Sequence, residues 1–332
     1  MNYKIIDNKT TENGANSKKI GTATFLPLTP EWSLDEIIMS KELRDTLEDI
    51  IAFCQNKQRI MKDWELNRFM KSGGGCIAIN FWGLPGTGKS IAAEALATAM
   101  NKKIIQASYA NLMDSLQGNT EKNISALFET AVAEDCVILF DEADGLLSAR
   151  KQNSANADTS NLIKSHLLNL LDRSSAIVIF TTNFFKSYDR AFVRRILWNV
   201  EFKTPGLEEL EALWKFHLSE KVPCKTTHRE LAGITFDESK ERGLNITGGD
   251  IRKLTLALCT RLSSGRIKMI DNLNAKEMIR RYLADLQEGG NTGTSKDVEI
   301  KPDNLPKDNR DSLEVDVKPD DLPKNLRDIL NK

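Results

Sequence analysis

The chain has 332 residues, of which 40% are apolar and 28% are charged, and its formal net charge is −1. This length allows one large domain and a smaller one, with a sizeable core. The near-neutral charge provides no global field that would draw the protein to nucleic acid or to an anionic membrane. No apolar run approaches the roughly 20 residues that span a bilayer, and the polar N-terminus lacks the apolar core of a secretion signal. We therefore expect a cytoplasmic protein without membrane contact.

The cysteines are dispersed, with no CxxC pair and no adjacent histidine. This usage is typical of reduced, mostly buried thiols in a cytosol-like compartment. It also disfavours a zinc site, which needs clustered ligands. The five residues are Cys54, Cys76, Cys136, Cys224 and Cys259.

Residues 1–30 are polar and are expected to form a flexible arm. From 33 to 69 apolar residues recur at helical spacing, and Ser40 is a suitable N-cap. Strand patterns then alternate with helical patterns, which predicts a parallel sheet with crossovers on both faces in a domain over 31–204. The strands are expected at 77–82, 103–106, 136–140, 176–180 and 200–202, and the helices at 90–100, 121–132 and 160–171.

Beyond Pro205 only helical patterns remain, and they predict an all-helical domain over residues 205–287. Helices are expected at 207–218, 250–262 and 274–286, with a shorter helical turn near 227–232. Residues 288–332 are poor in apolar side chains and are expected to be disordered. This tail repeats a motif, as KPDNLPK from Lys301 and KPDDLPK from Lys318. The repeat is either an unselective tether or a docking motif used twice.

Residues 83–90 spell GLPGTGKS, which fits the phosphate-loop pattern GxxxxGK[ST] between a predicted strand and a predicted helix. Glycines let successive backbone N–H groups turn toward phosphate oxygens, and the helix N-terminus adds attraction. Lys89 is placed to reach the β- and γ-phosphates, and the Ser90 hydroxyl to bind magnesium. We therefore expect ATP and Mg2+ as cofactors, bound by Pro85, Gly86, Thr87, Gly88, Lys89 and Ser90.

Two further strands end in polar residues that suit ATP hydrolysis. The apolar run 137–140 ends in Asp141, expected to hold the metal ion, and Glu142, expected to activate the attacking water. Adjacent acids can also form a plain solvated turn, but the phosphate loop favours the first interpretation. The strand at 176–180 leads to Asn183, which either holds the attacking water or simply terminates the strand.

With these motifs in order, the chain resembles the AAA+ ATPases, close to the branch of katanin- and spastin-like remodellers and to small single-module bacterial AAA proteins. The resemblance extends from about residue 32 to 286. It implies a P-loop NTPase α/β fold, with a parallel five-stranded sheet of order 5-1-4-3-2 and a C-terminal helical lid. It also implies a homo-oligomeric ring, usually a hexamer, with ATP at subunit interfaces. The motifs that carry it are GLPGTGKS, VILFDEAD, IFTTN, YDRAFVRRILWNVEF and NITGGDIRKL.

The resemblance also implies roles for single residues. Asn183 corresponds to sensor 1, Ile37 and Ile38 to the segment that contacts adenine, and Gly249 to the lid element that closes on the nucleotide. Arg194 and Arg195 stand where the family places arginine fingers, which stabilise charge on the γ-phosphoryl group of a neighbouring subunit. The residues alone also allow an ordinary surface pair, and they leave open which arginine is the finger.

Further residues stay outside this set of roles. Arg252 lies about 200° around its helix from Asp250 and is not counted as catalytic, and the isolated His166, His217 and His228 are given no catalytic role. Residues 114–119 resemble the first pore loop of threading relatives but carry Leu116 where an aromatic residue is usual, which favours modest remodelling over vigorous unfolding. The alternative is that Leu116 simply packs within its loop.

The leading hypothesis is an ATP-driven remodeller that acts as a ring on a protein partner. One alternative is a scaffold whose assembly is gated by nucleotide. The other is a DNA-acting protein of the loader type, although the near-neutral charge makes nucleic acid an unfavoured partner.

Overall fold

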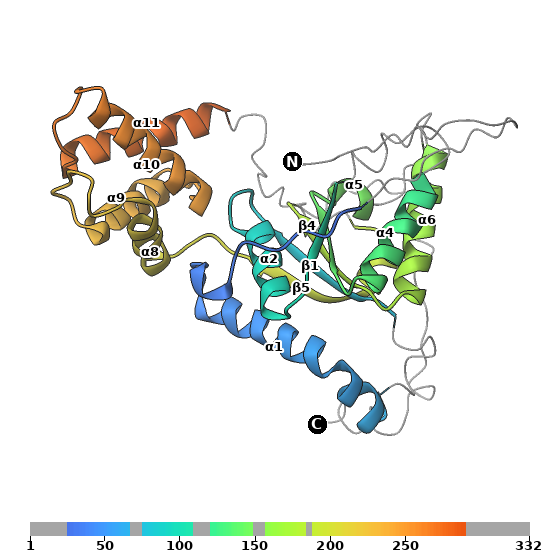
Figure 1. Ribbon diagram of the computed structural model, residues 1–332. Coiled ribbons are helices and arrows are strands. Elements are labelled where there is room, and N and C mark those ends of the chain that lie inside the picture. The colour runs from blue at the N-terminus through green and yellow to red at the C-terminus, as the bar shows by residue number, and fades with distance from the viewer. Residues whose placement is uncertain (1–24, 67–74, 109–119, 149–156, 184–187, 290–332) are drawn as a thin grey trace, which may run out of the picture. The chain divides into compact units, whose positions relative to one another are not determined.

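The computed structural model describes residues 25–66, 75–108, 120–148, 157–183 and 188–289 (Figure 1). The chain divides into two compact units, residues 1–285 and 286–332, and of the second only the end of the last helix is described. The expectations for the pore loop, for most of the N-terminal arm and for the repeated tail fall outside these ranges.

All five strands lie in one parallel sheet of order β2-β3-β4-β1-β5. Read from the other edge, this is the expected order 5-1-4-3-2, and the predicted fold class is confirmed. The strands are β1 (Ile77–Gly83), β2 (Ile104–Ser108), β3 (Val137–Asp141), β4 (Ile177–Thr182) and β5 (Ile196–Phe202).

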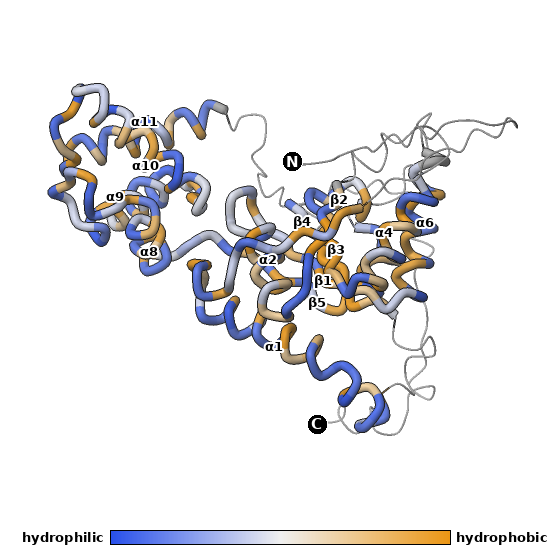
Figure 2. The backbone as a smooth tube through the Cα atoms, viewed as in Figure 1, coloured by the Kyte–Doolittle hydropathy of each residue, from blue (hydrophilic) through white to orange (hydrophobic). Residues whose placement is uncertain are grey.

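Helices cover both faces of this sheet, because side chains from alternate strand positions point to opposite sides. One core contains α4 (Thr120–Ala133) and α6 (Ala157–Arg173), with Phe140 and Phe180 stacked at 5.3 Å. The other core contains α1 (Lys41–Gln58) and α2 (Lys89–Ala99). Figure 2 shows the strands as the most apolar part of this layered arrangement.

The first helical segment is shorter than its pattern predicted. Ser40 caps α1 as expected, since its side chain accepts a hydrogen bond from the Leu43 N–H at 3.2 Å. The residues before it form only a short 3-10 turn, η1 (Leu34–Glu36), and α1 passes into the π-helical turn η2 (Arg59–Asp63). Before η1, the backbone of Leu28 pairs with Ile104 and so covers the outer edge of β2.

All described regular elements after β5 are helices, namely α8 (Leu207–His217), α9 (His228–Glu241), α10 (Gly248–Ser263) and α11 (Asn272–Gly289). The weak helical turn expected near 227–232 is the start of α9, a full helix whose buried face includes polar side chains. Thr235 accepts a hydrogen bond from the indole of the fully buried Trp214, and Glu238 binds Arg280 of α11. These pairings satisfy polar groups that would otherwise be costly to bury.

Two observations bear on the setting of the protein. The five cysteines are free; Cys136 is buried and the other four are partly buried, so the expectation of buried thiols holds in full only for Cys136. Within the described ranges, no helix has the length and apolar character that a membrane crossing requires.

Candidate functional site

The phosphate loop connects β1 to α2, so its backbone N–H groups lie at the N-terminus of an eleven-residue helix. Gly88 immediately precedes that helix with a φ of 95°, a left-handed conformation that L side chains disfavour. The exposed N–H groups and the positive end of the helix dipole make this turn suitable for binding an anion.

Lys89 lies beneath the loop, with only 8% of the residue exposed. Its ammonium group donates to the carbonyl oxygens of Gly83 at 2.8 Å and Leu84 at 2.9 Å, and to Oδ1 of Asn183 at 3.1 Å. Burial lowers the pKa of Lys89, and the nearby carboxylates, Asp141 foremost, oppose that shift. Lys89 therefore places its amine between the loop and the end of β4.

Ser90 and Asp141 form the expected hydroxyl–carboxylate pair. The Ser90 hydroxyl donates to Oδ1 of Asp141 at 2.9 Å, and the hydroxyl of Thr181 donates to the same oxygen. A hydroxyl and a carboxylate oxygen beside a phosphate loop fit Mg2+, which prefers oxygen ligands and shares its shell with phosphates and water.

Glu142, which follows Asp141, is exposed, and its backbone φ is 53°. Its N–H donates to the Thr181 hydroxyl at 3.1 Å, which stabilises this unusual backbone conformation. Non-glycine residues at positive φ are uncommon, and strained backbone recurs at functional positions. The conformation of Glu142 is consistent with a carboxylate held in a set position beside the Ser90–Asp141 pair.

Asn183 is held by a residue that the sequence had not singled out. Its backbone N–H donates to both carboxylate oxygens of Asp144, at 3.1 and 3.2 Å, while its side chain accepts from Lys89. Asp144 follows the acidic pair Asp141–Glu142 in the same run, which was the only signal available. The carboxylate therefore fixes the end of β4 against the residues that follow β3.

A cavity of about 1090 Å³ adjoins the phosphate loop. Its lining includes Ile37 and Ile38, loop residues 86–90, and Gly249. A volume of this size accommodates a nucleotide. The predicted binding residues therefore surround one space, except Pro85, which precedes the lining part of the loop.

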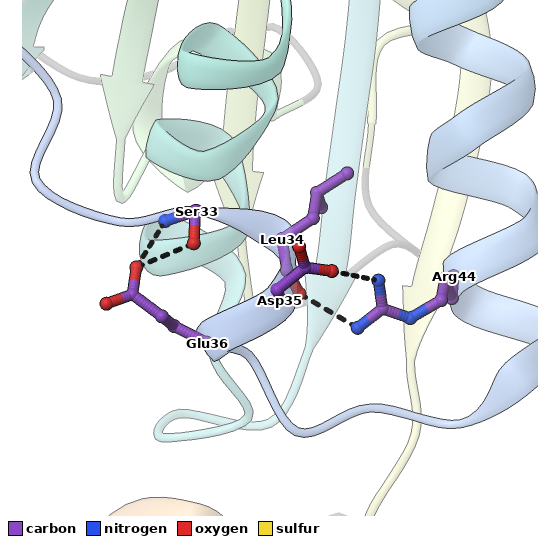
Figure 3. Close-up of polar contacts among 5 residues, drawn as sticks. All are labelled: Ser33, Leu34, Asp35, Glu36 and Arg44. Carbon is purple, nitrogen blue, oxygen red and sulfur yellow. Dashed lines mark hydrogen bonds and ion pairs between the residues drawn. The ribbon is translucent and has the colours of Figure 1, made fainter.

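The turn before Ile37 is held by local polar contacts (Figure 3). Both the N–H and the hydroxyl of Ser33 donate to Glu36, at 2.8 and 2.7 Å. These hydrogen bonds, the one from the side chain foremost, lower the pKa of Glu36. Arg44 of α1 donates to the Leu34 carbonyl at 2.9 Å and to Asp35 at 3.4 Å. The turn is thereby attached to α1, which orients the apolar wall of the cavity.

Two other residues of the lining were not counted as functional from the sequence. They are His217, at the end of α8, and Arg252, in the first turns of α10. Burial, and then the charge of Arg252, lower the pKa of His217, so its ring is neutral at pH 7 and can both donate and accept a hydrogen bond. Arg252 therefore lines the cavity, although its helical spacing from Asp250 gave no reason to count it as catalytic.

The two candidate finger arginines differ sharply. Arg195 forms a two-pronged ion pair with Asp172 of α6, with both N–O distances 2.7 Å, and also donates to the Ala191 carbonyl. The ion pair raises the pKa of Arg195. Arg194 is exposed at the end of α7 (Arg190–Val193), and among the described residues its side chain has no hydrogen bond or ion pair. Only Arg194 is thus available to a neighbouring molecule without breaking an existing pair.

Taken together, the parallel sheet, the phosphate loop and the acidic pair at the end of β3 define a P-loop nucleotide-binding domain. Residues 79–204 match the family described as "ATPase family associated with various cellular activities (AAA)". The predicted resemblance is confirmed over these residues, which match the AAA ATPase family.

Curated relatives support the same assignment. The chain is 29% identical over 227 residues to the 26S proteasome regulatory subunit 7 homolog of Schizosaccharomyces pombe, covering 63% of this chain and 51% of that protein. It is 28% identical over 222 residues to Protein CdcH of Halobacterium salinarum, covering 63% and 29%. It is 28% identical over 219 residues to human Spastin, covering 62% and 34%. The matches thus span about half or less of these relatives.

Proposed function

We propose that this chain binds Mg-ATP in the cavity beside the phosphate loop and hydrolyses it. The observation that carries the proposal is the convergence of Lys89, the Ser90–Asp141 pair and Asn183 where β1, β3 and β4 end. Parallel α/β sheets bind ligands at the carboxyl ends of their strands. The residues over 205–287 are proposed as the lid, with Gly249, His217 and Arg252 on its side of the cavity.

Each residue has a distinct task in this proposal. Lys89 and the loop N–H groups hold the phosphates, and Ser90 and Asp141 hold the metal ion. Magnesium, when bound, neutralises charge on the β- and γ-phosphate oxygens. Glu142 accepts the proton of the attacking water, and Asn183 orients that water. Ile37 and Ile38 pack against the adenine ring of the nucleotide.

Glu142→Gln tests whether Glu142 is the general base that accepts the proton of the attacking water. This variant keeps the shape of the side chain but cannot accept the proton, so we expect nucleotide binding near the parent level and kcat lowered about a hundredfold or more. Glu134→Gln, an exposed residue outside the site, is the matched control and is expected to be unchanged. Turnover at the parent rate in Glu142→Gln would remove Glu142 from the mechanism.

We further propose that Arg194 reaches the ATP site of an adjacent copy in a ring, whereas Arg195 positions the segment. Arg194→Ala is expected to lower kcat about a thousandfold, and Arg190→Ala, on the same short helix, serves as the exposed control. Arg195→Ala and Asp172→Asn are expected to share one milder phenotype, because each breaks the same ion pair. Loss of activity in Arg195→Ala but not in Asp172→Asn would exchange the two roles.

A mixing experiment tests whether Arg194 acts between subunits. Arg194→Ala retains an intact nucleotide site, and Lys89→Ala retains an intact Arg194. Mixing the two inactive variants is expected to restore part of the ATPase activity, because some sites then combine a functional loop with an arginine from the neighbour. A mixture as inactive as its components, in oligomers shown to exchange subunits, would rule out action in trans.

The proposed substrate class is protein, and the proposed assembly is a cytoplasmic hexameric ring. In support, the chain resembles a proteasome regulatory subunit and Spastin, and its cysteines are free. Full-length Glu142→Gln with ATP is the trap for isolating the bound partner. An unfolded or disassembled protein partner supports remodelling. Nucleotide-dependent assembly whose effect on the partner is indifferent to Leu116→Ala favours the scaffold, and stimulation of ATPase activity by DNA favours the loader.

A further inference from the structure

Tyr282, on the last helix α11, makes a hydrogen bond with the first turn of α10. Its hydroxyl donates to Oδ1 of Asp250 at 2.6 Å. Burial, and then the hydrogen bond and charge of Asp250, raise the pKa of Tyr282 above its ordinary value, so the phenol remains a neutral donor. A short hydrogen bond to a buried carboxylate is among the stronger polar contacts in a protein.

The other oxygen of Asp250 shapes the turn that precedes α10. Oδ2 accepts from the N–H of Thr247 at 2.9 Å and from its hydroxyl at 2.7 Å, and only 9% of Asp250 is exposed. A capping box of this kind fixes the backbone at the start of a helix. Tyr282 and Thr247 therefore use the two oxygens of one carboxylate, and each restricts its orientation for the other.

That turn lies directly against the phosphate loop. The N–H of Gly249 donates to the Gly86 carbonyl at 3.1 Å. The contact is close, because a Cβ added to Gly86 would lie 2.7 Å from the Thr247 hydroxyl oxygen. A continuous series of contacts thus runs from Tyr282 through Asp250 and Thr247 to Gly86 in the wall of the nucleotide cavity.

We propose that Tyr282 is a positioning residue for the ATP site, which holds the 247–249 turn against the phosphate loop through Asp250. The inference depends on the proposed binding of ATP. It makes α11, which ends before the tail that carries the repeat, energetically coupled to nucleotide binding. Since such coupling is reciprocal, ATP should in turn stabilise the packing of α11.

A second polar contact on α11 provides a matched control. Arg280 binds both oxygens of Glu238 on α9 at 2.9 Å, and Lys276 lies 3.3 Å from the same carboxylate. This cluster holds α11 against α9, and none of its three residues belongs to the described lining of the cavity. Arg280→Gln therefore removes a polar contact of α11 with α9 while leaving the hydrogen bonds among Tyr282, Asp250 and Thr247 in place.

The test compares ATP binding and turnover in full-length parent, Tyr282→Phe and Arg280→Gln. Tyr282→Phe is expected to raise KM for ATP about threefold to tenfold, a range typical of residues that modulate coupling, with kcat within about twofold because no reacting group is touched. Arg280→Gln is expected to leave KM unchanged, even if its melting temperature falls as much as that of Tyr282→Phe. An equal rise of KM in both variants, or none in Tyr282→Phe, would overturn the proposal.

A double-mutant cycle with Thr247→Val adds a second readout. If Tyr282 acts through Thr247, its replacement should raise KM much less in the Thr247→Val background than in the parent, whereas independent effects would multiply. Hydrogen exchange of α11 with and without ATP should show protection in the parent and less in Tyr282→Phe. If the parent itself neither binds ATP nor responds to Lys89→Ala, the proposed function has failed, and not the role of Tyr282.

Discussion

The substitution Gly88→Ala tests whether activity depends on the backbone conformation of the phosphate loop, separately from the stability of the fold. Gly88 has a φ of 95°, and a Cβ built on it meets no atom within 4 Å. The substitution therefore adds no clash, and its cost is the left-handed backbone alone. The loop must either hold an alanine in this conformation or rotate toward negative φ. Rotation would turn the adjoining N–H groups away from their present directions.

The size of the effect follows from that geometry. A left-handed conformation costs an L residue about 1–2 kcal/mol, and each kcal/mol shifts the melting temperature of a domain this large by roughly 2–4 °C. We therefore expect a modest fall, of about 2–8 °C. ATPase activity should fall far more, about a hundredfold, because a displacement near 1 Å in a reacting geometry has that effect.

The assay pairs thermal unfolding, followed by circular dichroism, with steady-state ATPase rates. Gly243→Ala is the control, since Gly243 also has a positive φ of 62° with open space around it but lies between α9 and α10. Both variants should melt slightly earlier, and only Gly88→Ala should lose activity. Equal activity in the two variants would refute the argument that the loop conformation, rather than general strain, governs phosphate binding.

Three further predictions follow from packing and ionisation. Gly83→Ala places Cβ 2.4 Å from the Phe202 carbonyl oxygen where β1 pairs with β5, so we expect a loss of about 3–5 kcal/mol from strain and overpacking, measured by urea unfolding. The pKa of His217 is lowered below 6.5, so the unfolded chain takes up the proton first and stability falls as pH drops below about 6.5; His217→Gln should flatten the curve of melting temperature against pH. Burial raises the pKa of the Cys54 and Cys76 thiols to about 11, so about a thousandth is thiolate at pH 8, and mass spectrometry should show both alkylated far more slowly than in the unfolded chain.

The sheet was predictable because its strands are short apolar runs separated by helical patterns, and β1, β3 and β4 are buried along almost their whole length. The strand order came from the family resemblance rather than from periodicity. The expected last strand at 200–202 was too short, because β5 begins at Ile196 and alternates buried with exposed residues at the sheet edge. The extent of α9 escaped prediction because its buried positions include Thr235 and Glu238, whose partners lie on other helices.

The candidate site, like the fold, was predictable from the sequence only in part. The phosphate loop and the acidic pair were recognisable because backbone conformation and metal binding require particular residues at fixed spacing along the chain. Asp144 and His217 were not recognisable, because their roles depend on where the fold places them. Asp144 is an ordinary acid until the end of β4 directs the Asn183 N–H at it. His217 becomes relevant only because α8 ends beside the cavity.

The adjacent arginines show why spacing could not resolve the last ambiguity. Arg194 and Arg195 have the same charge and nearly the same sequence context, so no local pattern distinguishes them. Asp172, 23 residues before Arg195, makes the difference by accepting two hydrogen bonds from its guanidinium. If Arg195 contacted a neighbouring subunit, its charge-assisted pair with Asp172 would have to break. Arg194 can make such a contact without breaking any pair. The proposed choice of Arg194 as the finger therefore depends on a tertiary contact of Arg195, which Asp172→Asn tests without altering either arginine.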